Sequence, residues 1–178
     1  YQLYTTRGSM RVITGKYKGR RFDIPRTFKA RPTTDFAKEN LFNVLQGYID
    51  FDEAPSALDL FSGTGSITLE LLSRGCGHVV SVENDPLHFG FICSFIDKLQ
   101  AKEAFPVRAD VFRYLARCRE RHEARMLREV VAFAVLEHKQ AALVGQALCD
   151  RFRGSHFAVL VSGTEKLHCC RSFFAVER

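Results

Sequence analysis

Residues 57–65 have the sequence Ala-Leu-Asp-Leu-Phe-Ser-Gly-Thr-Gly. An apolar run that carries one acid, Asp59, leads into Gly-x-Gly, and a helical pattern follows over residues 67–74. Glycines let backbone N–H groups approach a ligand where a Cβ would collide, and the start of a helix adds partial positive charge. The stretch therefore predicts a strand, a tight turn and a helix that together hold a ligand.

Short apolar runs alternate with helical patterns from Ser56 onward. This alternation is typical of βαβ units and a parallel sheet. It predicts an α/β fold with a doubly wound, mostly parallel, Rossmann-like sheet. The predicted strands are residues 57–61, 78–83, 105–109, 130–136, 157–161 and a closing edge strand at 172–176, and the predicted helices are 67–74, 87–99 and 111 to about 121.

A basic hairpin and one helix precede that pattern. Residues 11–15 and 19–24 predict two short strands around a turn that presents lysines to solvent. Thr34 or Asp35 can cap the following helix, which we expect to end near Gly47. Its apolar face carries Ala37, Leu41, Val44, Leu45 and Tyr48.

The chain of 178 residues has the length of one domain. Residues 1–9 show no pattern, and Gly8-Ser9-Met10 is typical of a cloning junction, so we expect a tail before a native start at Met10. The basic segment 10–50 and the α/β segment 51–178 are expected to form one compact unit.

Charge is concentrated near the N-terminus. Between Arg7 and Lys38 ten Lys or Arg residues stand against Asp23 and Asp35, a local net charge of +8, whereas the whole chain carries +6. A basic arm on a nearly neutral body favours a polyanionic partner such as RNA or DNA, although a solvated basic surface is the simpler alternative.

Two further acids end predicted strands. Glu83 follows residues 79–82, where a carboxylate can accept from both ribose hydroxyls of an adenosine, and Asp110 can accept from an adenine amino group. Each alone would be an ordinary strand-end acid, but with Asp59 they occupy three successive strand ends. A dinucleotide fingerprint would need a third glycine where Thr68 stands, so adenosine with a short charged tail fits better.

The six cysteines show neither C-x-x-C nor zinc spacing, and the six histidines are scattered, so we expect free thiols and no metal. The adjacent Cys169-Cys170 is typical of strand packing. The chain lacks a run of about 18 apolar residues and a secretory pattern, which predicts a cytoplasmic protein without membrane contact.

The assembled motifs make the chain similar to the RsmD family of bacterial methyltransferases, which modify guanine N2 in small-subunit ribosomal RNA. The N-terminal motifs are specific to that family, whereas the glycine loop is shared by many methyltransferases. The motifs are Arg11-Val-Ile-Thr-Gly-Lys-Tyr-Lys-Gly-Arg20, Arg31-Pro-Thr-Thr-Asp35, Leu41-Phe-Asn43, Leu58-Asp-Leu-Phe-Ser-Gly-Thr-Gly65 and Val82-Glu-Asn-Asp85.

The resemblance implies an S-adenosylmethionine-dependent methyltransferase fold with an N-terminal β-hairpin extension, and ribosomal RNA or the small-subunit particle as partner. We also expect a monomer. The implied cofactor residues are Asp59 to Gly65 for the methionine part, Glu83 for the ribose and Asp110 for the adenine, in full Asp59, Phe61, Ser62, Gly63, Thr64, Gly65, Glu83, Asn84, Asp110 and Val111. The implied RNA-binding residues are Arg11, Lys16, Lys18, Arg20, Arg21, Arg31 and Thr34.

The family pattern includes Asp/Asn-Pro-Pro-Phe/Tyr after the fourth strand, and no Pro-Pro occurs in this chain, so no catalytic residue is assigned. In the alignment that we favour, Val135-Leu136-Glu137-His138 is the fifth strand and the fourth is missing between about Arg119 and Leu127. In the alternative, residues 130–136 are the fourth strand, 141–152 a helix, and Glu137-His138 stands in the catalytic loop.

Three functions therefore remain open. The first is methylation of guanine N2 in small-subunit ribosomal RNA, and the second is an RNA-binding relative with impaired catalysis. A NAD-dependent oxidoreductase is the least favoured, because Thr68 replaces the third glycine.

Overall fold

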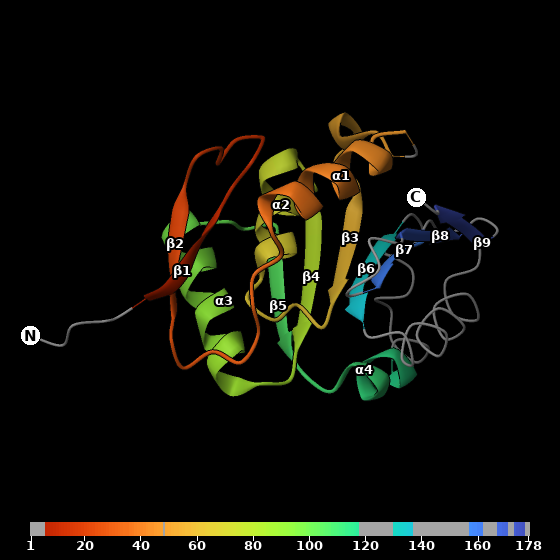
Figure 1. The fold of residues 1–178 in the computed structure, drawn as a ribbon. Coiled ribbons are helices and arrows are strands. Elements are labelled where there is room, and N and C mark those ends of the chain that lie inside the picture. The colour runs from red at the N-terminus through yellow and green to blue at the C-terminus, as the bar shows by residue number, and fades with distance from the viewer. Residues whose placement is uncertain are drawn as a thin grey trace, which may run out of the picture.

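The computed structural model describes residues 6–47, 49–117, 130–136, 157–161, 167–170 and 173–176. These residues form a two-stranded hairpin and a seven-stranded sheet with helices packed against it (Figure 1). In chain order the elements are β1 Thr6–Arg11, β2 Arg21–Pro25, α1 Asp35–Leu45, a 3-10 turn Phe51–Glu53, β3 Ser56–Leu60, α2 Ser66–Arg74, β4 His78–Glu83, α3 Pro86–Leu99, β5 Ala104–Arg108, α4 Val111–Arg117, β6 Val130–Leu136, β7 Phe157–Val161, β8 Leu167–Cys170 and β9 Phe173–Val176.

The large sheet has the strand order β5-β4-β3-β6-β7-β8-β9. The strands from β3 to β7 are parallel, and β8 and β9 are antiparallel. Chain order runs outward from β3 in both directions, so the topology switches at β3, and the parallel strands point toward the lower edge of Figure 1. The predicted α/β, Rossmann-like fold is confirmed, and ligands of such sheets bind outside the carboxyl ends at the switch point.

The strand β6 overturns the alignment that the sequence favours. Val130 lies opposite Ser56 and Ala134 opposite Leu60 in a parallel pair with β3, which is the place of the fourth strand. The fifth place belongs to β7. The run of β6 is entirely apolar, and a parallel strand on each side pairs with its backbone. The fourth place in the sheet is therefore occupied by β6 itself. Residues 119–127 and 137–156, with Glu137, His138 and the predicted helix at 141–152, lie outside the described residues.

The first strand of the hairpin is displaced from its predicted position at residues 11–15. It is β1, and Met10 lies opposite Phe22 in the antiparallel pair with β2. After Arg11 the chain turns, with Val12 N donating to Arg20 O and Gly19 N to Val12 O. The prediction missed residues 6–9 because they lack an apolar pattern, yet their backbone pairs with β2. The origin of residues 1–9 stays a prediction.

The helix α1 begins as predicted, because the Thr34 side chain accepts from Ala37 N at 3.2 Å. Leu41, Phe42 and Leu45 are buried on its inner face. Lys38 is buried with them at 1% exposure, which the apolar pattern did not predict. Tyr48 lies outside the described residues.

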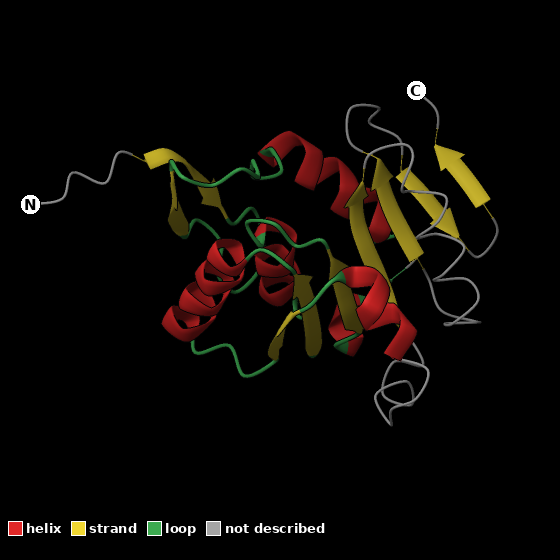
Figure 2. Cartoon of the chain, turned by 90° about the horizontal axis from the view of Figure 1, so that it is seen from below, coloured by secondary structure: helices red, strands yellow, loops and turns green. Residues whose placement is uncertain are grey.

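The N-terminal segment and the sheet share one hydrophobic core. Met10, Phe22 and Leu41 belong to the same buried cluster as Ala57 and Phe95. The Phe22 and Phe95 rings lie 5.6 Å apart, so the hairpin packs against α3. Two views at right angles place the hairpin at one end of the molecule and β8 with β9 at the other (Figure 1, Figure 2).

Cys76 and Cys93 are free thiols, and the backbone of Cys169-Cys170 lies in β8, a strand that the sequence did not delimit. Burial raises the pKa of the Cys76 thiol to about 12, which makes it unreactive at neutral pH. Among the described helices none is long and apolar enough to cross a bilayer.

Candidate functional site

The turn between β3 and α2 is tied to both neighbouring strand ends. Ser62 N donates to Val82 O at 3.1 Å, Ser62 Oγ donates to Asp59 O at 2.8 Å, and Gly65 N donates to Ser62 O at 2.7 Å. Gly63 and Gly65 have φ angles of 55° and 73°, and the non-glycine Phe61 has 57°. Left-handed backbone is costly for residues with a Cβ. Glycine avoids this cost at positions 63 and 65, whereas Phe61 is strained.

Asp59 lies beneath this turn and is 2% exposed. Its Oδ2 atom accepts from Thr68 N at 3.0 Å and from Thr68 Oγ1 at 2.5 Å. Burial is the main cause that raises the pKa of Asp59 to about 7, against the Thr68 hydrogen bonds that lower it. The carboxyl thus holds the first turn of α2 in place. Thr68 stands at the third-glycine position of a dinucleotide fingerprint and uses its side chain for this bond.

Asp59→Asn should change how stability depends on pH. The folded protein holds the Asp59 proton more tightly than the unfolded chain, whose pKa is near 3.8, so this carboxyl favours folding fully below about pH 4 and loses that contribution as pH rises through about 7. Asn does not titrate. The free energy of unfolding of the parent minus that of the variant should therefore fall by roughly 4 kcal/mol between these limits.

Urea unfolding of both proteins at pH steps from 4 to 8 measures this difference. Asp97→Asn, at an exposed acid of α3, is the control and should leave the pH dependence of the parent unchanged. A difference between the parent and Asp59→Asn that is flat with pH would show that Asp59 is ionised in the fold at all these values.

Glu83 joins the glycine turn to the end of β4. Its Oε2 atom accepts from Gly63 N at 2.7 Å and its Oε1 atom from Asp85 N at 2.8 Å. Each carboxylate oxygen has a further lone pair, so both can accept a hydroxyl in addition. The carboxylate is half-buried, and the neighbouring Asn84 is exposed. Glu83 therefore lies at the carboxyl end of β4 beside the glycine turn, and its role as a ribose acceptor stays a prediction.

Asp110 lies two residues after the end of β5 and directly before α4. Its Oδ1 atom accepts from Arg113 N at 3.0 Å, and the side chain is exposed, whereas Val111 is buried. Phe112, which the sequence did not single out, is 42% exposed, and its ring lies 6.2 Å from that of Phe61 at 71°. The sequence signal that could have indicated Phe112 is its place two residues after the acid Asp110. These two rings and Asp110 can form one side of a nucleobase site.

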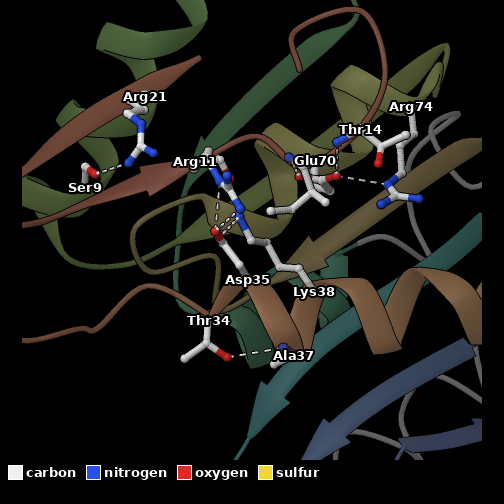
Figure 3. Close-up of polar contacts among 11 residues, drawn as sticks. Ser9, Arg11, Thr14, Arg21, Thr34, Asp35, Ala37, Lys38, Glu70 and Arg74 are labelled. Carbon is white, nitrogen blue, oxygen red and sulfur yellow. Dashed lines mark hydrogen bonds and ion pairs between the residues drawn. The ribbon is translucent and has the colours of Figure 1, made fainter. Parts of the chain in front are cut away.

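The basic residues divide into paired and exposed groups. Arg11 Nη2 lies 2.9 Å from Asp35 Oδ2, and Lys16 Nζ lies 2.6 Å from Glu103 Oε1 (Figure 3 shows the Arg11 pair). Arg21 is exposed and donates to Ser9 Oγ at 3.4 Å. The Thr34 hydroxyl caps α1. Lys18, Arg20, Arg26, Lys29 and Arg31 are exposed and form no ion pair with the residues that the structure describes.

Comparison with known proteins places these features in a family. The family model described as "Conserved hypothetical protein 95" matches residues 10–127, which is more than half of the chain. "Putative rRNA methyltransferase YlbH" of Bacillus subtilis is 43% identical over 76 residues, 43% of this chain and 40% of the relative. "Ribosomal RNA small subunit methyltransferase D" of Escherichia coli K12 is 33% identical over 109 residues, 61% of this chain and 54% of the relative.

A solved structure extends the likeness to most of the fold. "Putative methyltransferase yhhF from Escherichia coli" has a TM-score of 0.68 and 26% identity, and the match covers 86% of this chain and 80% of that one. The chain spans about half the length of the two curated relatives. The family model matches a part of the chain that includes the glycine turn, Glu83, Asp110 and the basic residues between positions 12 and 20.

Proposed function

This chain belongs to the family described as Conserved hypothetical protein 95, the RsmD family, and we propose that it methylates guanine N2 in small-subunit ribosomal RNA with S-adenosylmethionine. One observation carries the cofactor assignment. The Glu83 carboxylate accepts from Gly63 N at the switch point of the sheet, so a ribose acceptor and the glycine turn are held together.

The site residues fit the cofactor in their chemistry. Gly63 and Gly65, both with positive φ, add no side chain at two positions of the turn, and the amino end of α2 favours the methionine carboxylate. Glu83 has lone pairs for the ribose hydroxyls and Asp110 for the adenine amino group. When bound, S-adenosylmethionine supplies an electrophilic methyl group on a sulfonium. Asp59 is a positioning residue in this proposal, because it holds α2 from beneath.

The proposed nucleic-acid surface is the set of exposed cations on and after the hairpin. Lys18, Arg20, Arg21 and Arg31 would contact phosphates, which position RNA without reading its sequence. Guanine N2 is a poor nucleophile, since its lone pair is delocalised into the ring, and the enzyme must accept its hydrogens and orient it in line with the methyl group. The expected place for those acceptors follows β6, beyond the described residues.

Methyl transfer to unmodified small-subunit particles tests the proposal. We expect tritium from labelled S-adenosylmethionine to appear in N2-methylguanosine after nuclease digestion, and S-adenosylhomocysteine to bind with measurable heat. Particles that already carry the modification serve as the control and should incorporate no label. Absence of heat at high protein concentration would refute the cofactor assignment.

The absence of a Pro-Pro pair from this chain favours a second candidate, an RNA-binding relative that has lost catalysis. It predicts salt-dependent RNA binding, since phosphate contacts release counterions, together with no incorporated label. Incorporated label rules it out. For either function we propose a cytoplasmic monomer without membrane contact, and light scattering after size exclusion checks the oligomeric state.

A further inference from the structure

Glu70 is a fully buried carboxylate that the proposed cofactor site does not use. It is 0% exposed, its Oε2 atom accepts from Ile13 N and its Oε1 atom from Thr14 N, both at 3.0 Å, and Arg74 Nε donates to Oε1 at 3.1 Å (Figure 3). A buried charge is tolerated only where hydrogen bonds replace its hydration. Two of these donors come from a segment more than fifty residues away in the chain, so Glu70 holds the hairpin on α2.

Ser73, one turn further along α2, continues this attachment. Its hydroxyl donates to Thr14 O and accepts from Tyr17 N at 3.0 Å, and its carbonyl accepts from Lys16 N at 2.8 Å. Gly15 lies so close that a Cβ there would be 1.8 Å from Ser73 O. The backbone of residues 13–17 is therefore pressed directly against the end of α2.

A buried cation of α1, Lys38, holds the backbone of Arg11, just before this segment. Lys38 Nζ of α1 donates to Arg11 O and lies 3.3 Å from Asp35 Oδ1. Two helices thus fix the main chain at the start of the basic turn, which we define as residues 12–20. The exposed cations Lys18 and Arg20 lie on this turn.

We propose that Glu70 is a positioning residue for RNA, which holds the basic turn in its binding conformation; this inference rests on the proposed function. The helix α2 begins directly after Gly65 of the glycine turn, and its last residues contact the basic turn. One helix of nine residues therefore sets the spacing between cofactor and phosphate contacts. A turn that is already ordered binds RNA without paying for its ordering at that moment.

Charge and position predict opposite effects of Glu70→Gln. Removal of an acid next to a basic surface would strengthen RNA binding if only charge mattered. Loss of one acceptor, with an amide N–H₂ group in its place facing a backbone donor, releases Ile13 or Thr14 and should weaken binding. We expect about a tenfold loss of RNA affinity, the cost of ordering one or two turn residues.

The experiment measures binding of an unmodified small-subunit ribosomal RNA transcript by fluorescence anisotropy, with S-adenosylhomocysteine binding and amide hydrogen exchange in parallel. Glu70→Gln should lose RNA affinity and the protection of the Ile13 and Thr14 amides while it keeps S-adenosylhomocysteine affinity. The control Glu39→Gln removes the same charge from an exposed position of α1 and should bind RNA as tightly as the parent or more tightly.

Gly15→Ala tests the same attachment without a change of charge and decides the question if Glu70→Gln fails to fold. It should weaken RNA binding similarly, whereas Gly90→Ala, with open space around the new methyl group, should not. RNA binding by Glu70→Gln or Gly15→Ala as tight as by its control overturns this inference alone. A parent protein that binds no RNA overturns the proposed function and this inference together.

Discussion

Glu83→Gln should weaken S-adenosylhomocysteine binding about 100-fold. The carboxylate accepts from Gly63 N and Asp85 N, and in the proposed complex it also accepts from the ribose. An amide has one acceptor atom, so it turns an N–H₂ group toward one backbone donor and loses the charge-assisted bonds. Such bonds contribute about 1.5–3 kcal/mol each, and about 3 kcal/mol corresponds to 100-fold in affinity. Isothermal titration calorimetry measures the effect.

Glu103→Gln is the matched control for this substitution. Glu103 precedes β5, at the amino end of the strand and away from the carboxyl ends where the site lies, and it pairs with Lys16. Its replacement should leave S-adenosylhomocysteine affinity within about twofold of the parent, since exposed ion pairs contribute little. Equal affinities for Glu83→Gln and Glu103→Gln would remove Glu83 from the binding site.

Gly65→Ala should lower the free energy of unfolding by about 3 kcal/mol. A Cβ at this position would lie 2.7 Å from Phe95 Cε1 and 2.9 Å from Ile92 Cγ1, both on α3, and the φ angle of 73° is strained for alanine. Overpacking costs about 1–3 kcal/mol and left-handed backbone about 1–2 kcal/mol. Because Gly65 also begins α2, the same variant should reduce S-adenosylhomocysteine affinity.

Gly90→Ala separates this packing effect from a general effect of glycine replacement. Gly90 lies within α3 with nothing within 4 Å of an added Cβ, so alanine should raise the free energy of unfolding by about 0.5–1 kcal/mol. Urea unfolding of both variants gives the comparison. If Gly65→Ala is as stable as the parent, α3 can move away from an added methyl group without loss of stability, which contradicts this prediction.

The parallel part of the fold could be predicted because its signals are local. β4 has the predicted bounds, as do β6 and β7, since apolar runs of five to seven residues between turn residues allow little freedom. Thr34 and Asp85 begin α1 and α3 by capping their first N–H groups, a short-range interaction. The strands β1 and β8 have no such run, because each is held by backbone pairing to a partner elsewhere in the chain.

The role of individual charges could not be predicted in the same way. Ten basic residues near the N-terminus looked alike in the sequence, yet Lys38 is buried against Arg11 O while Lys18 and Arg20 are exposed. Glu70 had no place in the predicted site at all. Whether a charge faces water or another element depends on residues distant in the chain, here 27 positions for Lys38.

Periodicity and residues adjacent in the chain predict the strands from β3 to β7, the glycine turn, and the acids Asp59, Glu83 and Asp110 at or just after the ends of three strands. Three other features depend on contacts between distant residues: the pairing of β6 with β3, the hydrogen bonds from Thr68 to Asp59, and the attachment of the basic turn to α2 by Glu70. Burial and long-range pairing change the pKa, the exposure and the partners of a side chain, and none of these is set by its neighbours in sequence.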